Sequence, residues 1–326
     1  MRTGLSVILF ALLFSQDIAT RNPLAFVGAI PLPGVEGRID HLAYDAAAAR
    51  LFIAALGNNT VEVLDLKNSR HHSTRPGFRE PQGIAAAPDL RLVAVANGQG
   101  DGIQVLDAED FRVTRTVRLG DDADNVRYER AGERWYVGYG DGALAAVTAA
   151  EGAVAGEARL PGHPESFQLE SSGPRIFVNV PAADRIAVVD RRSMKVVAAW
   201  PVIGARANFP MALDEPRHRL FIGCRRPAKA LVYDTTTGRP LTSFDIVGDT
   251  DDLFYDAARK RLYVAGGEGF LDVFEEPQPN QFTRVAHLPT ASGARTALFV
   301  PDLGRLYLAV PHRGSQAAQI RIYQAP

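Results

Sequence analysis

Short apolar runs separated by turn residues repeat along nearly the whole chain. In the clearest copy, residues 250–275, three runs of aliphatic, aromatic and β-branched residues are separated by a charged turn and then by a glycine turn. Runs of this length and composition predict strands joined in a meander. None of them has the length or the 3.6-residue period of a helix. The pattern therefore predicts an all-β protein.

The same unit occurs seven times in one register. Its second run opens on an arginine in every copy, with RLFIAAL at Arg50, RLVAVAN at Arg91, RWYVGYG at Arg134, RIFVNV at Arg175, RLFIGC at Arg219, RLYVAGG at Arg261 and RLYLAV at Arg305. The first residue of each unit, its start position, is Asp40, Gln82, Asp124, Glu165, Phe209, Asp251 or Thr296. A period in the forties with four short strands per unit is typical of a propeller blade. The sequence predicts a seven-bladed β-propeller with four-stranded antiparallel blades.

The two ends of the repeat array are complementary. Leu24–Leu32 supplies one strand more than the first unit needs, whereas the last unit stops after its third strand, at Ile320–Tyr323. We expect the N-terminal strand to complete the last blade. This pairing would close the ring and remove two exposed sheet edges.

A repeated aspartate closes the third strand of several units. Asp65, Asp107, Asp190 and Asp234 take this place, each followed by polar turn residues. Aspartate side chains commonly accept hydrogen bonds from backbone groups two and three residues further on. The recurrence by blade favours a turn role over four separate functional sites.

The second strands also carry a family resemblance. The RLYV-type runs resemble the YVTN repeat, and the chain after its first residues resembles the YncE-like seven-bladed propellers of bacterial envelopes. The resemblance implies the propeller fold and an envelope location. Members of that group mostly have no assigned reaction, so it implies no catalytic residues.

Residues 1–19 differ from the repeats. Arg2 is the only charge before Asp17, and Leu5–Phe14 is a continuous apolar run too short to span a bilayer. This anatomy predicts an export signal, with Ala19 as a plausible last residue and an uncleaved anchor as the alternative. Residues 20–326 are then a single propeller domain. We expect a periplasmic or secreted monomer with no membrane span beyond the leader.

Composition excludes several classes of function. The formal net charge of −1 gives no electrostatic footprint for nucleic acid. Cys224 is the only cysteine, and there is no haem motif, so the chain is not expected to hold a redox cofactor of its own. The glycine clusters at residues 98–102 and 138–142 lead into strands rather than helices, which predicts hairpin turns and not nucleotide-binding loops.

Candidate functional residues lie in the loops that precede each first strand. In a propeller these loops and the turns between second and third strands share one face, and the former converge on the central channel. Carboxylates, amides, a histidine and arginines would then surround the channel mouth. The candidate ligand-binding residues are Arg38, Asp40, His41, Gln82, Asp124, Asn125, Glu165, Asn208, Asp251, Asp252 and Arg295, with His163, Ser166 and Arg206 nearby.

Three functions fit this arrangement. The first is a non-enzymatic binding or scaffold protein that takes a small molecule, a peptide or a protein at its loop-rich face. The second is a lactonase-like, metal-dependent hydrolase in which Asp40, Asp124, Glu165 and Asp251 hold a divalent cation such as calcium, as oxygen ligands suit hard cations. The third is a redox partner or a subunit of a cofactor enzyme. A solvated lining without a ligand is the alternative to all three.

Overall fold

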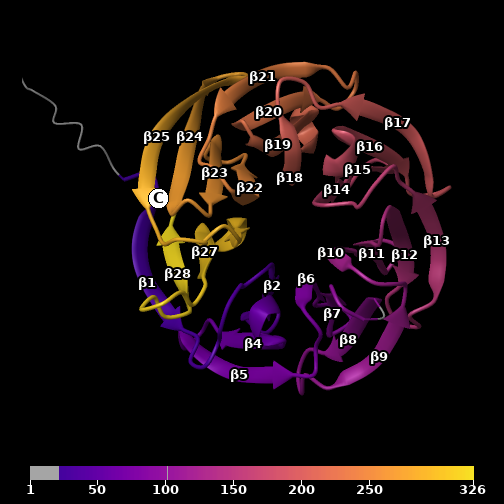
Figure 1. Ribbon diagram of the computed structural model, residues 1–326, viewed down its shortest axis with the longest axis vertical. Coiled ribbons are helices and arrows are strands. Elements are labelled where there is room, and N and C mark those ends of the chain that lie inside the picture. The colour runs from indigo at the N-terminus through magenta and orange to yellow at the C-terminus, as the bar shows by residue number, and fades with distance from the viewer. Residues whose placement is uncertain (1–21, 101) are drawn as a thin grey trace, which may run out of the picture.

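The computed structural model describes residues 22–100 and 102–326, whose strands form seven four-stranded antiparallel sheets arranged in a ring (Figure 1). This confirms the predicted seven-bladed propeller. The predicted leader, residues 1–19, lies outside the described residues. Within the described ranges, no helix has the length and apolar character needed to cross a membrane.

The blades follow the repeat units, from the innermost strand outward. Blade 1 contains β2 (Leu42–Asp45), β3 (Arg50–Ala55), β4 (Thr60–Asp65) and β5 (Arg70–Pro76). Blade 2 contains β6 (Pro81–Ala87), β7 (Leu92–Asn97), β8 (Gly102–Asp107) and β9 (Val113–Arg118). Blade 3 contains β10 (Ala123–Glu129), β11 (Arg134–Tyr139), β12 (Ala143–Thr148) and β13 (Val154–Arg159). Blade 4 contains β14 (Phe167–Leu169), β15 (Arg175–Val180), β16 (Arg185–Asp190) and β17 (Lys195–Pro201).

The remaining blades keep this order. Blade 5 contains β18 (Arg206–Asp214), β19 (Arg219–Arg226), β20 (Ala228–Asp234) and β21 (Pro240–Asp245). Blade 6 contains β22 (Thr250–Asp256), β23 (Arg261–Gly266), β24 (Phe270–Gln278) and β25 (Gln281–Pro289). Blade 7 contains β26 (Ala297–Val300), β27 (Arg305–Val310), β28 (Gln319–Gln324) and β1 (Ala25–Pro31). Single 3₁₀ turns are η1 (Leu56–Asn58), η2 (Pro181–Ala183), η3 (Glu215–Arg217) and η4 (Pro301–Leu303).

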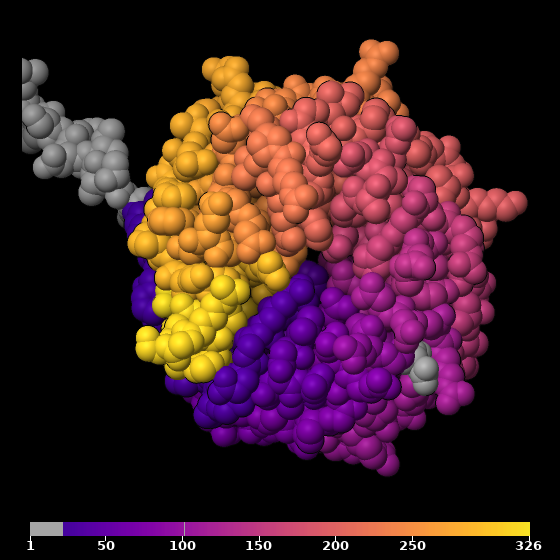
Figure 2. All heavy atoms as spheres, in the orientation of Figure 1, coloured from indigo at the N-terminus to yellow at the C-terminus, as the bar shows by residue number. Residues whose placement is uncertain are grey.

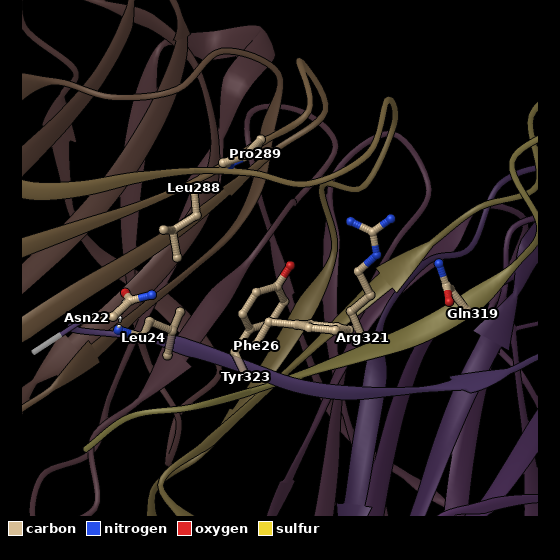
Figure 3. Close-up of a pocket in the computed structure, with 8 residues that line it drawn as sticks. All are labelled: Asn22, Leu24, Phe26, Leu288, Pro289, Gln319, Arg321 and Tyr323. Atoms are coloured by element: carbon tan, nitrogen blue, oxygen red, sulfur yellow. Dashed lines mark hydrogen bonds between the residues drawn. The ribbon is translucent and has the colours of Figure 1, made fainter.

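The N-terminal strand closes the ring as predicted. β1 pairs antiparallel with β28, from Ala25 opposite Gln324 to Pro31 opposite Gln319, and becomes the outer strand of blade 7. Where β1, β25 and β28 meet, the side chains of Phe26, Leu288 and Tyr323 line a hollow of about 460 Å³ (Figure 3). The closing strand therefore contacts blade 6 as well as blade 7.

The core is divided between neighbouring blades. In the described part of the chain the buried apolar side chains form seven clusters, and each cluster draws its members from two adjacent blades. Middle strands such as β3 are buried on both faces, which explains their continuous apolar runs. Outer strands such as β5 alternate between exposed and half-buried residues because only one face meets a neighbour. Blade-to-blade packing is thus the main apolar stabilisation.

The repeated aspartates make the predicted turns. Oδ1 of Asp65 accepts the backbone N–H of Lys67 at 3.1 Å, and Oδ1 of Asp107 accepts that of Glu109 at 2.7 Å. Oδ1 of Asp190 accepts the backbone N–H of Ser193 at 2.8 Å, and Oδ1 of Asp234 accepts that of Thr236 at 2.9 Å. These bonds confirm a local role in ending the third strand.

The repeated arginine at the start of the second strand connects neighbouring blades. Nη1 of Arg50 donates to the carbonyl of Ala108 in blade 2 at 2.5 Å, and Nη1 of Arg261 donates to the carbonyl of Pro23 ahead of β1 at 3.0 Å. Nη2 of Arg219 donates to Oε2 of Glu276 in blade 6 at 3.0 Å. In these three units the arginine that the repeat marks therefore links one blade to the next, at the end of the ring opposite the channel mouth.

Candidate functional site

The loops before the innermost strands gather at one end of the central channel, which β2, β6, β10 and β22 help to surround (Figure 1). The turns between second and third strands bond to these loops. The N–H of Gly140 donates to the carbonyl of Asp121 at 3.1 Å, and that of Gly267 donates to Asp249 at 3.0 Å. Both sets of loops therefore share one face. We call the start positions and the loops before them the channel mouth, where the filled ring leaves only a narrow central opening (Figure 2).

A left-handed residue recurs two positions before the start position. Glu80, Asp122, Ala207 and Asp249 have φ values of 51°, 54°, 58° and 52°. This conformation turns the chain sharply just before the inner strand. Aspartate tolerates it, whereas alanine adopts it at a steric cost. The same local geometry thus presents the start positions of blades 2, 3, 5 and 6.

One part of the mouth consists of carboxylates paired with arginines. Nη2 of Arg38 lies 2.8 Å from Oδ2 of Asp40 and 3.7 Å from Oδ2 of Asp251. Asp251 also lies 2.6 Å from Nη2 of Arg225 and 3.1 Å from Nε of Arg295. Burial raises the pKa of Asp251 despite the opposing effect of Arg225. The side chains of Asp40 and Asp251 are almost fully buried, so these ion pairs offset a large desolvation cost.

His41 lies between two carboxylates. Its ring nitrogens are each 3.6 Å from a carboxylate oxygen, Nε2 from Asp40 and Nδ1 from Asp252. Burial disfavours the charged imidazolium, but Asp252 and then Asp40 outweigh this effect and raise the pKa of His41 to about 10. His41 is therefore a cation at neutral pH and helps Arg38 to balance the buried acids.

A second part of the mouth has no arginine pair. Ligand atoms of Asp124, His163 and Glu165 all lie within 4.8 Å of one another. Nδ1 of His163 lies 2.7 Å from the carbonyl of Gly140, and because a carbonyl can only accept, Nδ1 carries the hydrogen. In the neutral ring this contact leaves the lone pair on Nε2, which lies 3.6 Å from Oδ2 of Asp124, and in the charged ring Nε2 carries a hydrogen toward that carboxylate.

The pKa shifts in this second part reflect the same crowding. Burial, followed by repulsion from Asp124 and Asp251, raises the pKa of Glu165 well above its usual range. Burial would lower the pKa of His163, but its hydrogen bond to Asp124 outweighs that effect and raises it. Burial would likewise raise the pKa of Asp124, yet His163 holds it low. A shared proton or a cation would relieve this repulsion.

The other predicted residues occupy different surroundings. Nε2 of Gln82 donates to Oδ1 of Asp122 at 3.3 Å, and Asn125 is buried. Nδ2 of Asn208 donates to Oδ1 of Asn179 at 2.8 Å and to the carbonyl of Arg185 at 3.0 Å. Asn208 is fully buried, so these bonds join blades 4 and 5 beneath the mouth. Asn208 therefore acts in the structure as a link between blades.

Two cationic residues were absent from the candidate residues of the sequence analysis. Arg225 comes from the end of β19 and bonds to the carbonyl of Thr250 at 2.8 Å as well as to Asp251. Arg127, on β10, lies within electrostatic reach of Asp252 and Asp124. The signal for Arg225 was the sequence Arg225-Arg226-Pro227, which replaces the glycine turns of other blades. Arg127 had no such signal, since it lies inside an inner strand.

Comparison with known proteins supports the fold and leaves the family open. No protein-family model matches the chain, and no curated protein matches it. The structure is similar to a chain of the mitotic checkpoint complex, with a TM-score of 0.79 and 14% identity over 99% of this chain and 98% of that one. It is also similar to a chain of Kuenenia stuttgartiensis hydrazine synthase, with a TM-score of 0.73 and 15% identity over 85% of this chain and 95% of that one. At such identities the likeness shows the fold alone.

Proposed function

We propose that the chain is an exported binding protein, similar to the YncE-like propellers, that holds a polar ligand at its channel mouth. Its support is the convergence of buried acids, histidines and arginines from separate blades on one opening. Burying so many charges is costly unless they are paired or bind a ligand. A rigid ring of blades keeps such groups in place, which suits binding.

The ligand we propose for the second part of the mouth, around Asp124, His163 and Glu165, is a divalent cation. The observation that carries this proposal is the grouping of Asp124, His163 and Glu165 within 4.8 Å, with Nδ1 of His163 held by the Gly140 carbonyl. Such a contact on the distal nitrogen is the usual support of a metal-binding histidine. The imidazole beside two carboxylates favours zinc over calcium, since imidazole suits zinc whereas calcium prefers oxygen ligands alone.

Calorimetric titration of the full chain, after chelator treatment, tests this assignment. We expect one zinc ion per chain, tighter binding of zinc than of calcium, and a higher Tm in the presence of zinc. His163→Gln and Glu165→Gln should each weaken zinc binding at least about tenfold. Glu151→Gln, in an exposed turn, is the matched control and should bind as the parent does.

Other outcomes separate the alternatives. Loss of binding in Asp251→Asn but not in His163→Gln would instead favour the set Asp40, Asp124, Glu165 and Asp251. Heat signals that are equal in the parent, His163→Gln and Glu165→Gln would contradict a cation site at this mouth. A three-residue site also leaves coordination positions for water, as a hydrolase needs. Turnover of a simple lactone by the zinc-loaded parent, lost in Glu165→Gln, would identify the enzyme alternative.

Export is a separate part of the proposal, motivated by the apolar run Leu5–Phe14. Expressed from its full reading frame in a bacterial host, the chain should accumulate outside the cytoplasm. N-terminal sequencing should place the first residue between about residues 17 and 25, as expected for a cleaved leader. Recovery of the chain from the cytoplasm with Met1 or Arg2 first would contradict this expectation.

A further inference from the structure

A hollow of about 790 Å³ lies beside the channel mouth, between blades 4 and 5. Blade 4 contributes the small side chains of η2 and the carboxylate of Asp184. Blade 5 contributes Arg206 and Phe209 from β18 and Arg225 and Arg226 from the end of β19. The hollow is thus distinct from the cluster of Asp124, His163 and Glu165. Its charge has the opposite sign, with three guanidinium groups and one carboxylate.

Two of these arginines lack partners. Arg206 and Arg226 face each other directly as a cross-strand pair of β18 and β19. Within residues 22–100 and 102–326, neither guanidinium has a hydrogen-bond, ion-pair or ring partner. Like charges directly opposite each other destabilise a sheet. Every other arginine described above at the mouth is paired with a carboxylate or lies close to one. An anionic ligand between Arg206 and Arg226 would relieve the repulsion between their guanidinium groups.

The backbone next to Arg206 makes the same left-handed turn as in three other blades, but here with an alanine. Ala207, next to Arg206 within β18, has φ of 58°, in the left-handed region that disfavours alanine. The equivalent positions of blades 3 and 6 carry aspartate, which tolerates this conformation. Backbone strain of this kind is found preferentially at functional sites. Here it sets the direction of the chain between Arg206 and Phe209, the two β18 residues that line the hollow.

Phe209 gives the hollow an aromatic wall. It occupies the start position of blade 5, where blades 1, 3, 4 and 6 carry a carboxylate. The guanidinium of Arg225 lies over its ring at 3.7 Å and is anchored to Asp251 at 2.6 Å. Arg225 is therefore committed to the ring and to the acid, which leaves the anion-binding capacity of the hollow with Arg206 and Arg226. Phe209, Pro181 and Ala182 offer apolar surface beside these two charges.

We infer that this hollow binds a small organic oxyanion, with its carboxylate or phosphate group between Arg206 and Arg226 and its apolar body against Phe209. Guanidinium groups bind both oxyanions through paired, charge-assisted hydrogen bonds. Asp184 also lines the hollow, where its carboxylate would accept a hydrogen bond from a hydroxyl or amino group on such a ligand. The inference does not depend on the proposed cation, since the two sites share no side chain.

Calorimetry with four probes tests the inference, with chelator present throughout. Benzoate and phenyl phosphate carry the two oxyanions on one ring, benzyl alcohol is the neutral ring, and inorganic phosphate is the anion alone. We expect at least one of the two aromatic anions to bind, and Arg206→Gln/Arg226→Gln to weaken it at least about tenfold, as expected for charge-assisted hydrogen bonds. Phe209→Ala should weaken the aromatic anions but leave inorganic phosphate unchanged. Preference between benzoate and phenyl phosphate identifies the oxyanion.

The control removes the same charge elsewhere. Arg192→Gln lies in an exposed turn after β16, at the opposite end of its blade, and should bind the probes as the parent does. Arg206 and Arg226 are exposed, so their double variant should keep the parent's Tm. The inference is overturned if neither aromatic anion binds below about 10 mM, a limit near the weakest affinities that calorimetry resolves. Equal binding by the parent and the double variant would overturn it as well.

Discussion

A chain that lacks Leu24–Leu32 should lose the cooperative unfolding of the closed ring. This deletion removes β1, the outer strand of blade 7, and with it the buried side chains of Leu24, Ile30 and Leu32. Burial of one such side chain contributes about 1.5–3 kcal/mol. Three of them together with the strand pairing amount to roughly 5 kcal/mol or more, which is comparable with the whole stability of many domains. We expect a much lower Tm and association of the exposed β28 edges.

Thermal unfolding and size-exclusion chromatography measure both effects. Two point variants on the same strand provide a matched pair. Ile30→Ala, at a buried position, should cost about 2–5 kcal/mol, whereas Val27→Thr, at a position 54% exposed, should cost little. A monomeric deletion variant with the parent's Tm would show that ring closure contributes nothing to stability.

The metal-free protein should lose stability as the pH rises from about 6.5 to 10. His41 binds its proton more tightly in the folded state, because its pKa rises from an ordinary 6.5 to about 10. Its contribution to the free energy of unfolding is therefore complete below pH 6.5 and is lost as the pH rises toward 10. The pKa values of His163 and Glu165 are each raised to about 9, so these two groups also lose their contributions to stability within this range, whereas Asp251, raised only to about 6, loses its contribution at lower pH. Asp124, with a lowered pKa, matters only on the acid side.

Thermal unfolding in chelator across this pH range measures the effect. We expect Tm to fall by about 5 °C or more, since 1 kcal/mol corresponds to about 2 °C for a chain of this size. His41→Asn should flatten the curve. His218→Asn, in an exposed turn, should leave its slope unchanged. A parent curve that is level or rises between these pH values would contradict the charge arrangement described for the mouth.

The fold could be predicted because its determinants repeat. Each blade buries both faces of its middle strands, so RLFIAA in β3 and RLYVAG in β23 show the same continuous apolar run. The missing last strand and the extra first one followed from counting these runs. The repeated arginine was recognised as a marker, but its role was not. Arg50 and Arg219 bond to the next blade, and contacts between blades depend on how successive sheets are rotated, which the spacing within a blade does not specify.

The candidate site was predicted only in part for the same reason. The register of start positions located Asp40, Asp124, Glu165 and Asp251 at one opening. It could not show that Asp251 meets Arg225 while Asp124 meets His163, because each of these partners comes from another blade. Arg225 lies on a second strand and reaches Asp251 across a blade boundary. Asn208 lies one position before the start position of blade 5, yet its side chain bonds to blade 4.

The pairing of β1 with β28 also governs how the molecule is assembled during synthesis. These strands are separated by about 290 residues, so the contact that completes blade 7 is among the most distant in sequence within the described part of the chain. Contacts so far apart in sequence form late and slowly. Until the C-terminal residues are made, β1 remains a free strand and the ring a curved, open array. At high concentration the free β1 of one chain can complete blade 7 of another, so exchange of this strand between two copies is the characteristic misassembly of this ring.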